Sequence, residues 1–95
     1  MMRALRWHGA QDLRLEQIPI PRPGSQQVRI AVQYCGICGS DLHEYESGPH
    51  AIPVGTAHAV SGRSAPLTLG HEFCGTVVEL GSEVTGLQVG DRVAV

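Results

Sequence analysis

Two short stretches of the sequence hold side chains that can bind a transition metal. The first contains Cys38 and His43, and the second contains the adjacent pair His71 and Glu72. Thiolate, imidazole and carboxylate groups are all ligands for Zn²⁺, and a catalytic zinc takes three protein ligands and keeps a fourth position open. Since the ligands need not be close in the sequence, Cys38 with His71 and Glu72 is a candidate set for a catalytic zinc.

Single residues of these types also have an ordinary structural interpretation. A histidine in a loop is more often solvated or hydrogen-bonded than metal-bound, and Glu72 taken alone fits an exposed surface carboxylate. Nothing around His8, His50 or His58 resembles a site, so these three are interpreted as structural. Cys74 lies inside an apolar strand pattern and is interpreted as a small core residue.

Cys35 and Cys38 form a Cys-x-x-Cys pair that admits two further interpretations. A zinc knuckle would need a fourth ligand at position 48, and that residue is Gly48. A thioredoxin-like redox pair would begin a longer helix within a βαβ unit. Here glycines at positions 36 and 39 interrupt the segment and no βαβ pattern follows. A small zinc-binding interaction module built on the two cysteines is kept as an alternative.

The elements that must position these residues are predicted to be mostly β-strands. Residues 28–34 alternate apolar and polar side chains, which predicts a half-buried strand leading to Cys35. Residues 73–80 are rich in valine and threonine and predict a strand directly after His71 and Glu72. Further strands are predicted at 3–8, 13–18 and 89–95, with a hairpin turn at 9–12.

A short helix is predicted to begin within the first metal-binding stretch. It should run for one or two turns, with Ser40 as its N-cap and Asp41 in its first turn. Residues 46–66 show no regular period and are rich in small and polar residues. A connection of this length in a compact domain is usually functional or mobile.

Composition and charge exclude several classes of function. The 95 residues are 42% hydrophobic and 17% charged, with a formal net charge of −2, as in an ordinary globular domain. The basic residues are scattered and there is one Trp and one Phe, so no nucleic-acid surface is predicted. No apolar run approaches the ~20 residues of a membrane span. Without a signal-peptide pattern, we expect a cytoplasmic protein with no nucleic-acid or membrane partner.

The metal-binding stretches resemble those of a known enzyme family. Residues 34–43 (YCGICGSDLH) are similar to the catalytic-zinc loop of the medium-chain zinc alcohol dehydrogenases, and residues 69–78 (LGHEFCGTVV) look like the second-ligand motif of that family. The run 79–93 continues the similarity, so order and spacing agree over essentially the whole chain. Residues 44–45 and the insertion 49–62 most resemble the 2,3-butanediol and sorbitol dehydrogenases.

The resemblance implies a mainly β, GroES-like fold, which is a small, partly open β-barrel with one short helix. It implies that Cys38, His71 and Glu72 bind the catalytic zinc, with Glu72 as a permanent or exchanging ligand. Cys35 matches no ligand position of the family and is expected to be structural.

The resemblance also implies a reaction. Ser40 would contact the substrate alcohol through its hydroxyl group, and His43 would pass the released proton toward solvent. Zinc would act as a Lewis acid on the alcohol oxygen. Hydride would then pass from a secondary alcohol or diol to NAD or NADP.

The chain is expected to be part of a longer enzyme. Residues 1–95 would form the N-terminal part of the catalytic domain, because no Gly-x-Gly-x-x-Gly of a Rossmann domain occurs and the last residues lie within an apolar run. The isolated segment is then expected to be inactive and to self-associate through unfinished strand edges, whereas the full-length enzyme would be a homo-oligomer. The zinc-free GroES-like module of quinone-reductase-like proteins is a second alternative, although such proteins generally lack the cysteine–histidine ligand set.

Overall fold

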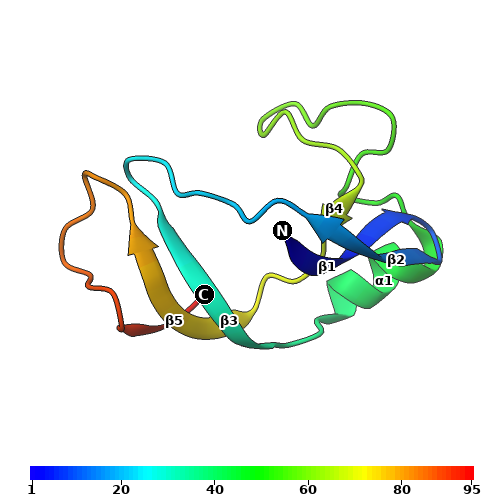
Figure 1. The fold of residues 1–95 in the computed structure, drawn as a ribbon. Coiled ribbons are helices and arrows are strands. Elements are labelled where there is room, and N and C mark those ends of the chain that lie inside the picture. The colour runs from blue at the N-terminus through cyan, green and yellow to red at the C-terminus, as the bar shows by residue number, and fades with distance from the viewer. The chain divides into compact units, whose positions relative to one another are not determined.

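The computed structural model describes residues 1–95, which divide into two compact units. The first unit contains Met1–Pro19 and Ile37–Gly70, and the second contains Ile20–Gly36 and His71–Val95. Each unit holds one three-stranded sheet, with the order β2-β1-β4 in the first and β3-β5-β6 in the second. The elements, labelled in Figure 1, are β1 (Met2–Gly9), β2 (Asp12–Ile18), β3 (Val28–Cys35), α1 (Gly39–Ser47), β4 (Leu67–Thr68), β5 (Phe73–Leu80) and β6 (Arg92–Ala94).

The first unit is built on the hairpin of β1 and β2. The strands pair antiparallel from Met2 and Ile18 to the turn, where Gln11 takes a φ of 57°. The strands expected at 3–8 and 13–18 and the turn at 9–12 are therefore confirmed. The two-residue strand β4 pairs with the other edge of β1, placing Thr68 opposite Arg6. The sequence pattern did not predict β4.

Trp7 is the centre of the core in the first unit. Its side chain is fully buried, and Ala4 on the same strand is also buried. A Cβ placed on Gly48, just after α1, would lie 2.9 Å from Cζ2 of Trp7. The lack of a side chain at Gly48 therefore allows the end of the helix to approach the indole ring closely.

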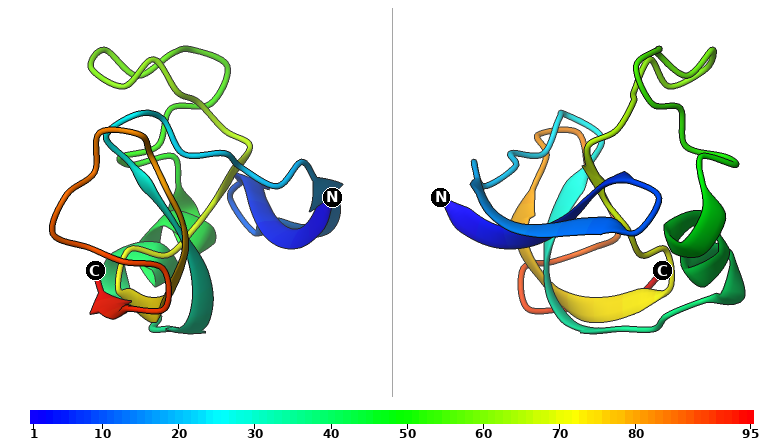
Figure 2. Two further views of the ribbon diagram at one scale, coloured as in Figure 1. Left: turned by 60° about the vertical axis from the view of Figure 1, so that its left-hand side comes forward. Right: turned by 90° about the vertical axis from the view of Figure 1, so that its right-hand side faces the viewer.

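The second unit is built on the antiparallel pair of β3 and β5, which run side by side in Figure 2, with β6 on the free edge of β5. The predicted strands at 28–34 and 73–80 are confirmed, and Val77 of β5 is fully buried. The strand predicted at 89–95 is shorter in the structure, where only β6 (Arg92–Ala94) is a strand. Gly90 lies in a turn with a φ of 101° and donates its N–H to the carbonyl of Val77 at 2.8 Å.

The alternating pattern of β3 correctly predicted a strand but not its burial. Val32 is 55% exposed and Tyr34 is 78% exposed, although both were expected on a buried face. The register with β5 shifts between Val32 and Tyr34. A bulge of this kind interrupts the alternation of side chains along a strand.

The architecture is mainly β, with two small sheets and one helix, and neither sheet closes into a barrel. This agrees with the mainly β, open architecture that was expected from the sequence. The one helix is too short to cross a membrane.

Gly75 is required for the close pairing of β3 and β5. A Cβ at this position would lie 2.2 Å from the carbonyl oxygen of Ala31 and 2.7 Å from Cγ2 of Ile30. We therefore expect Gly75→Ala to lower the free energy of unfolding by about 2–3 kcal/mol, because the strands must move apart. Gly9→Ala is the matched control, since a Cβ on Gly9 would meet no atom within 4 Å. Urea unfolding followed by circular dichroism would contradict the expectation if the two variants had the same midpoint.

Candidate metal centre

Cys38 lies at the N-terminus of α1. It is the N-cap residue, with extended backbone angles, and its carbonyl accepts the N–H groups of Asp41 and Leu42 at 3.0 and 3.2 Å. Its own N–H donates to Oδ2 of Asp41 at 3.1 Å. The start of a helix favours negative charge, and a thiolate is the form of cysteine that binds metals.

The helix differs from its prediction in two respects. Ser40 is not the N-cap but an exposed residue of the first turn, because the Asp41 carboxylate bonds to the backbone of Cys38 and starts the helix earlier. Asp41 lies in the first turn as expected. The helix has nine residues, which is about two and a half turns and longer than predicted.

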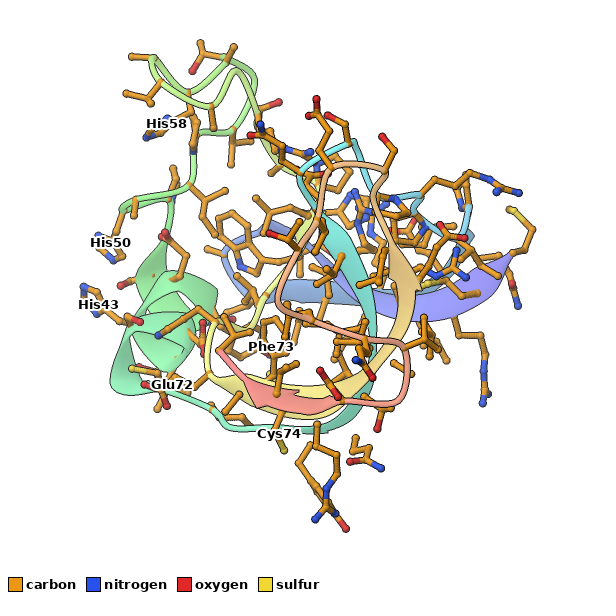
Figure 3. The ribbon with its side chains drawn as sticks, turned by 90° about the vertical axis from the view of Figure 1, so that its left-hand side faces the viewer. His43, His50, His58, Glu72, Phe73 and Cys74 are labelled. Carbon is orange, nitrogen blue, oxygen red and sulfur yellow. The ribbon has the colours of Figure 1, made fainter.

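His71 and Glu72 lie side by side directly before β5 in the second unit. Nε2 of His71 is 3.8 Å from Oε1 of Glu72, and both side chains are more than half exposed. Two ligands of a tetrahedral zinc, each about 2.1 Å from the metal, stand roughly 3.4 Å apart. Only a small adjustment would therefore bring both atoms onto one ion. Figure 3 labels Glu72 with Phe73 and Cys74 at the start of the strand.

The backbone around this pair is fixed by the end of the β3–β5 ladder. Gly36 donates its N–H to the carbonyl of Glu72 at 2.8 Å, one step beyond the pairing of Cys35 with Phe73. Gly70 precedes the pair with a φ of 116°, a conformation that favours glycine. The segment that leads out of β3 therefore passes directly beside Glu72.

The chemistry of the donor set fits zinc. Cys38, His71 and Glu72 each offer one ligand atom, respectively a sulfur, a nitrogen and an oxygen. These are the donors that protein zinc sites use. The three cysteines of the chain form no disulfide. Cys35 is exposed, and Cys74, which was interpreted as a core residue, is half-buried.

His43 has a partner that the sequence did not indicate. The rings of His43 and His50 stack with their centroids 3.8 Å apart and their planes 8° from parallel. Figure 3 shows His43 on α1 and His50 nearby on the segment that follows the helix. Nε2 of His50 is hydrogen-bonded to Oγ of Ser47 at 2.8 Å. His50 was interpreted as structural because nothing around it in the sequence resembles a site. Its contact with His43 depends on how the chain folds back after α1.

The buried carboxylate of Glu44 holds the segment that carries His50. It is 4% exposed and accepts backbone N–H groups from His50, from Ala51 at 2.7 Å and from Ile52 at 2.9 Å. Burial acts to raise the pKa of Glu44, but the three hydrogen bonds outweigh it and hold the pKa below its ordinary value. The connection after α1 is thus anchored at its beginning.

The two remaining histidines have structural partners. His8 is hydrogen-bonded to Glu16 across the β1–β2 hairpin, with 2.5 Å between Nε2 and Oε1. Nδ1 of His58 accepts the backbone N–H groups of Val60 and Ser61 at 3.2 Å each. These contacts give both histidines a role in local structure.

Comparison with known proteins agrees with the motifs and the fold. Residues 24–95 match the family model of the alcohol dehydrogenase GroES-like domain. The chain is 52% identical over 94 residues to (R,R)-butanediol dehydrogenase of Bacillus subtilis, covering 99% of this chain and 27% of that protein. It is 49% identical over 86 residues to sorbitol dehydrogenase of Halalkalibacterium halodurans, covering 90% of this chain and 22% of that protein.

Solved structures give the same result. The crystal structure of 2R,3R-butanediol dehydrogenase from Bacillus subtilis matches with a TM-score of 0.93 at 52% identity, covering 98% of this chain and 27% of that one. A candidate zinc-binding dehydrogenase from Sinorhizobium meliloti 1021, solved with NADP, matches with a TM-score of 0.73 at 36% identity, covering 95% of this chain and 23% of that one.

These matches confirm the GroES-like fold and the resemblance of the chain to the medium-chain alcohol dehydrogenases. The chain spans about a quarter of the length of the relatives it matches. With a family model that covers residues 24–95 and relatives identical at about half of the aligned positions, the chain belongs to the alcohol dehydrogenase GroES-like domain family.

Proposed function

We propose that this chain is the zinc-binding part of the catalytic domain of a longer dehydrogenase. The enzyme would transfer hydride from a secondary alcohol or diol to NAD or NADP. The matched relatives are butanediol and sorbitol dehydrogenases, which supports a diol or polyol as substrate. The cofactor domain would lie outside these 95 residues.

The observation that carries this proposal is the hydrogen bond between Gly36 and Glu72. It holds the segment leaving β3 beside the His71–Glu72 pair at 2.8 Å. Cys38 follows Gly36 by two residues, so its Cα lies no more than about 7 Å from that of Gly36. This short connection supports Cys38 as the third ligand. In this proposal Cys38, His71 and Glu72 hold the ion.

Ser40 and His43 are proposed to move the proton of the substrate alcohol. When bound, zinc supplies Lewis-acid polarisation of the alcohol oxygen. The Ser40 hydroxyl can accept that proton while it donates its own. His43, one helical turn further along α1, can take up the proton on a ring nitrogen and pass it to water, because its side chain is exposed.

The remaining parts of the proposal concern the whole protein. We infer that it is a homo-oligomer located in the cytoplasm, where cysteines stay reduced and available to bind a metal. The isolated segment would be inactive and would self-associate through its strand edges. The zinc-free quinone-reductase-like module and the small zinc-binding interaction module are the competing functions, and neither is supported by the matched relatives.

The test is alcohol oxidation by the whole protein that carries this segment. We expect NAD- or NADP-dependent oxidation of 2,3-butanediol or sorbitol that falls at least about 100-fold when zinc is removed and returns when zinc is restored. Magnesium is the matched control, because it prefers oxygen ligands and should not restore activity. Full activity of the metal-free protein would overturn the proposal and favour the zinc-free module.

A further inference from the structure

The first unit contains a cavity that the proposed dehydrogenase site does not use. Its volume is about 430 Å³. The lining residues are Arg6, Arg63, Ser64, Pro66, Leu67 and Thr68. Two arginines and two residues with hydroxyl groups thus line a space that falls in the size range of small-molecule sites.

Arg6 has a buried donor without an acceptor. Its Nε is buried and makes no hydrogen bond, although another nitrogen of the same guanidinium donates to the carbonyl of Pro66. Because this Nε is closed off from solvent, a ligand in the cavity would be bound by the other N–H groups of the guanidinium, which suits a carboxylate or phosphate in particular.

No carboxylate of the chain neutralises Arg6. The residues opposite it on the two flanking strands are Arg14 and Thr68. Arg14 is itself bound to Asp12 through two hydrogen bonds of 2.9 Å. These bonds hold the pKa of Asp12 below its ordinary value, so that carboxylate already has a partner. The charge of Arg6 therefore faces the cavity uncompensated.

Arg63 is held at the cavity by its backbone. Its N–H donates to Oγ of Ser61 at 3.3 Å, and its carbonyl accepts the N–H of His58 at 2.7 Å. Two residues later, Ala65 donates its N–H to the carbonyl of Pro53 at 2.8 Å. No ion pair of the structure includes Arg63. A second positive charge is thus positioned on the cavity by a bonded loop.

We propose that this cavity is a binding site for a small organic anion, whose phosphate or carboxylate group is bound by Arg6 and Arg63. The cavity is larger than a bare ion requires, so the anionic group would carry a short polar chain. The Ser64 and Thr68 hydroxyls would contact that chain. The proposal does not depend on the zinc site, because none of the proposed zinc ligands lines the cavity.

The test is calorimetric titration of the metal-free protein at low salt with inorganic phosphate, glycerol 3-phosphate, acetate and glycerol. We expect saturable binding of at least one of the three anions and none of glycerol. Tighter binding of glycerol 3-phosphate than of acetate would identify a phosphate ester as the ligand class, and the reverse would identify a carboxylate. The absence of saturable binding for all three anions would overturn the proposal.

Substitutions distinguish anion binding in this cavity from non-specific electrostatic attraction of anions to the protein surface. Arg6→Gln and Arg63→Gln should each weaken the binding at least tenfold, which corresponds to the loss of one charged hydrogen-bond partner. Arg3→Gln is the matched control, because Arg3 is an exposed arginine of the same strand that does not line the cavity. Since Arg63 lies in a loop outside the strands, its variant tests the site even if the Arg6 variant folds poorly. Equal weakening by Arg3→Gln and Arg63→Gln would overturn the proposal.

Discussion

Replacing Cys38 by serine is expected to abolish the sulfur-to-metal absorption of the Co²⁺-loaded protein, whereas replacing Cys35 by serine should leave it intact. Cobalt reports thiolate ligation through its absorption spectrum and takes the place of zinc in tetrahedral sites. Loss of a group that merely supports a ligand lowers metal affinity by about 10–100-fold, so loss of a direct ligand should exceed about 100-fold.

The two cysteines differ in their surroundings, although only two residues separate them. Cys38 lies at the positive end of α1, with its backbone bonded to Asp41. Cys35 is exposed at the end of β3, and its sulfur has only a weak contact of 3.6 Å with the carbonyl of Gly36. Of the two cysteines, only Cys38 therefore has a helix terminus that favours the thiolate.

The same titration distinguishes the competing functions. Equal loss of the absorption in both variants would make Cys35 a ligand and would support the interaction module instead. Circular dichroism of each variant should match that of the unchanged protein, because neither cysteine is fully buried. A Cys38→Ser variant that keeps the full cobalt absorption would contradict the proposed ligand set.

The strands could be predicted because their signals are local. Alternation of apolar and polar residues, together with turn residues at 9–12, specified the β1–β2 hairpin and the positions of β3 and β5. β4 could not be found in this way, since two residues have no period and its pairing depends on contact with β1 across some sixty positions. The burial of β3 was also missed, because a bulge depends on the partner strand.

The candidate ligands could be named from residue types, but the supporting contacts could not. Cys38, His71 and Glu72 are of residue types that can bind zinc, and this can be read from the sequence alone. The N-cap was wrongly placed at Ser40, because the Asp41 side chain selects the start of the helix through a contact that propensity does not describe. His50 and Glu44 act through the path of the chain after α1, so only the three-dimensional structure connects them with His43.

The carboxylate of Glu44 should be the most important single polar group for the stability of the first unit. Glu44→Ala removes the acceptor of three backbone N–H groups and leaves a gap in a buried position. We expect the free energy of unfolding to fall by about 2–4 kcal/mol, because donors that lose a buried partner cost roughly 1–3 kcal/mol each and some will rebind water. Glu46→Ala is the matched control, since Glu46 is exposed on the same helix.

The contribution of Glu44 should also depend on pH in a defined direction. Its pKa in the folded protein lies below the ordinary value of 4.5, so the unfolded chain takes up the proton first. The stabilisation is then fully present above about pH 4.5 and is lost as the pH falls through the lowered pKa. Urea unfolding between pH 3 and 7 should show a shallower acid loss for Glu44→Gln than for the unchanged protein, because glutamine cannot titrate. Parallel pH curves would mean that other carboxylates cause the acid sensitivity.

The same carboxylate should also hold the proposed proton-relay histidine in place. In Glu44→Ala, but not in Glu46→Ala, we expect the nuclear Overhauser contacts between the rings of His43 and His50 to be lost.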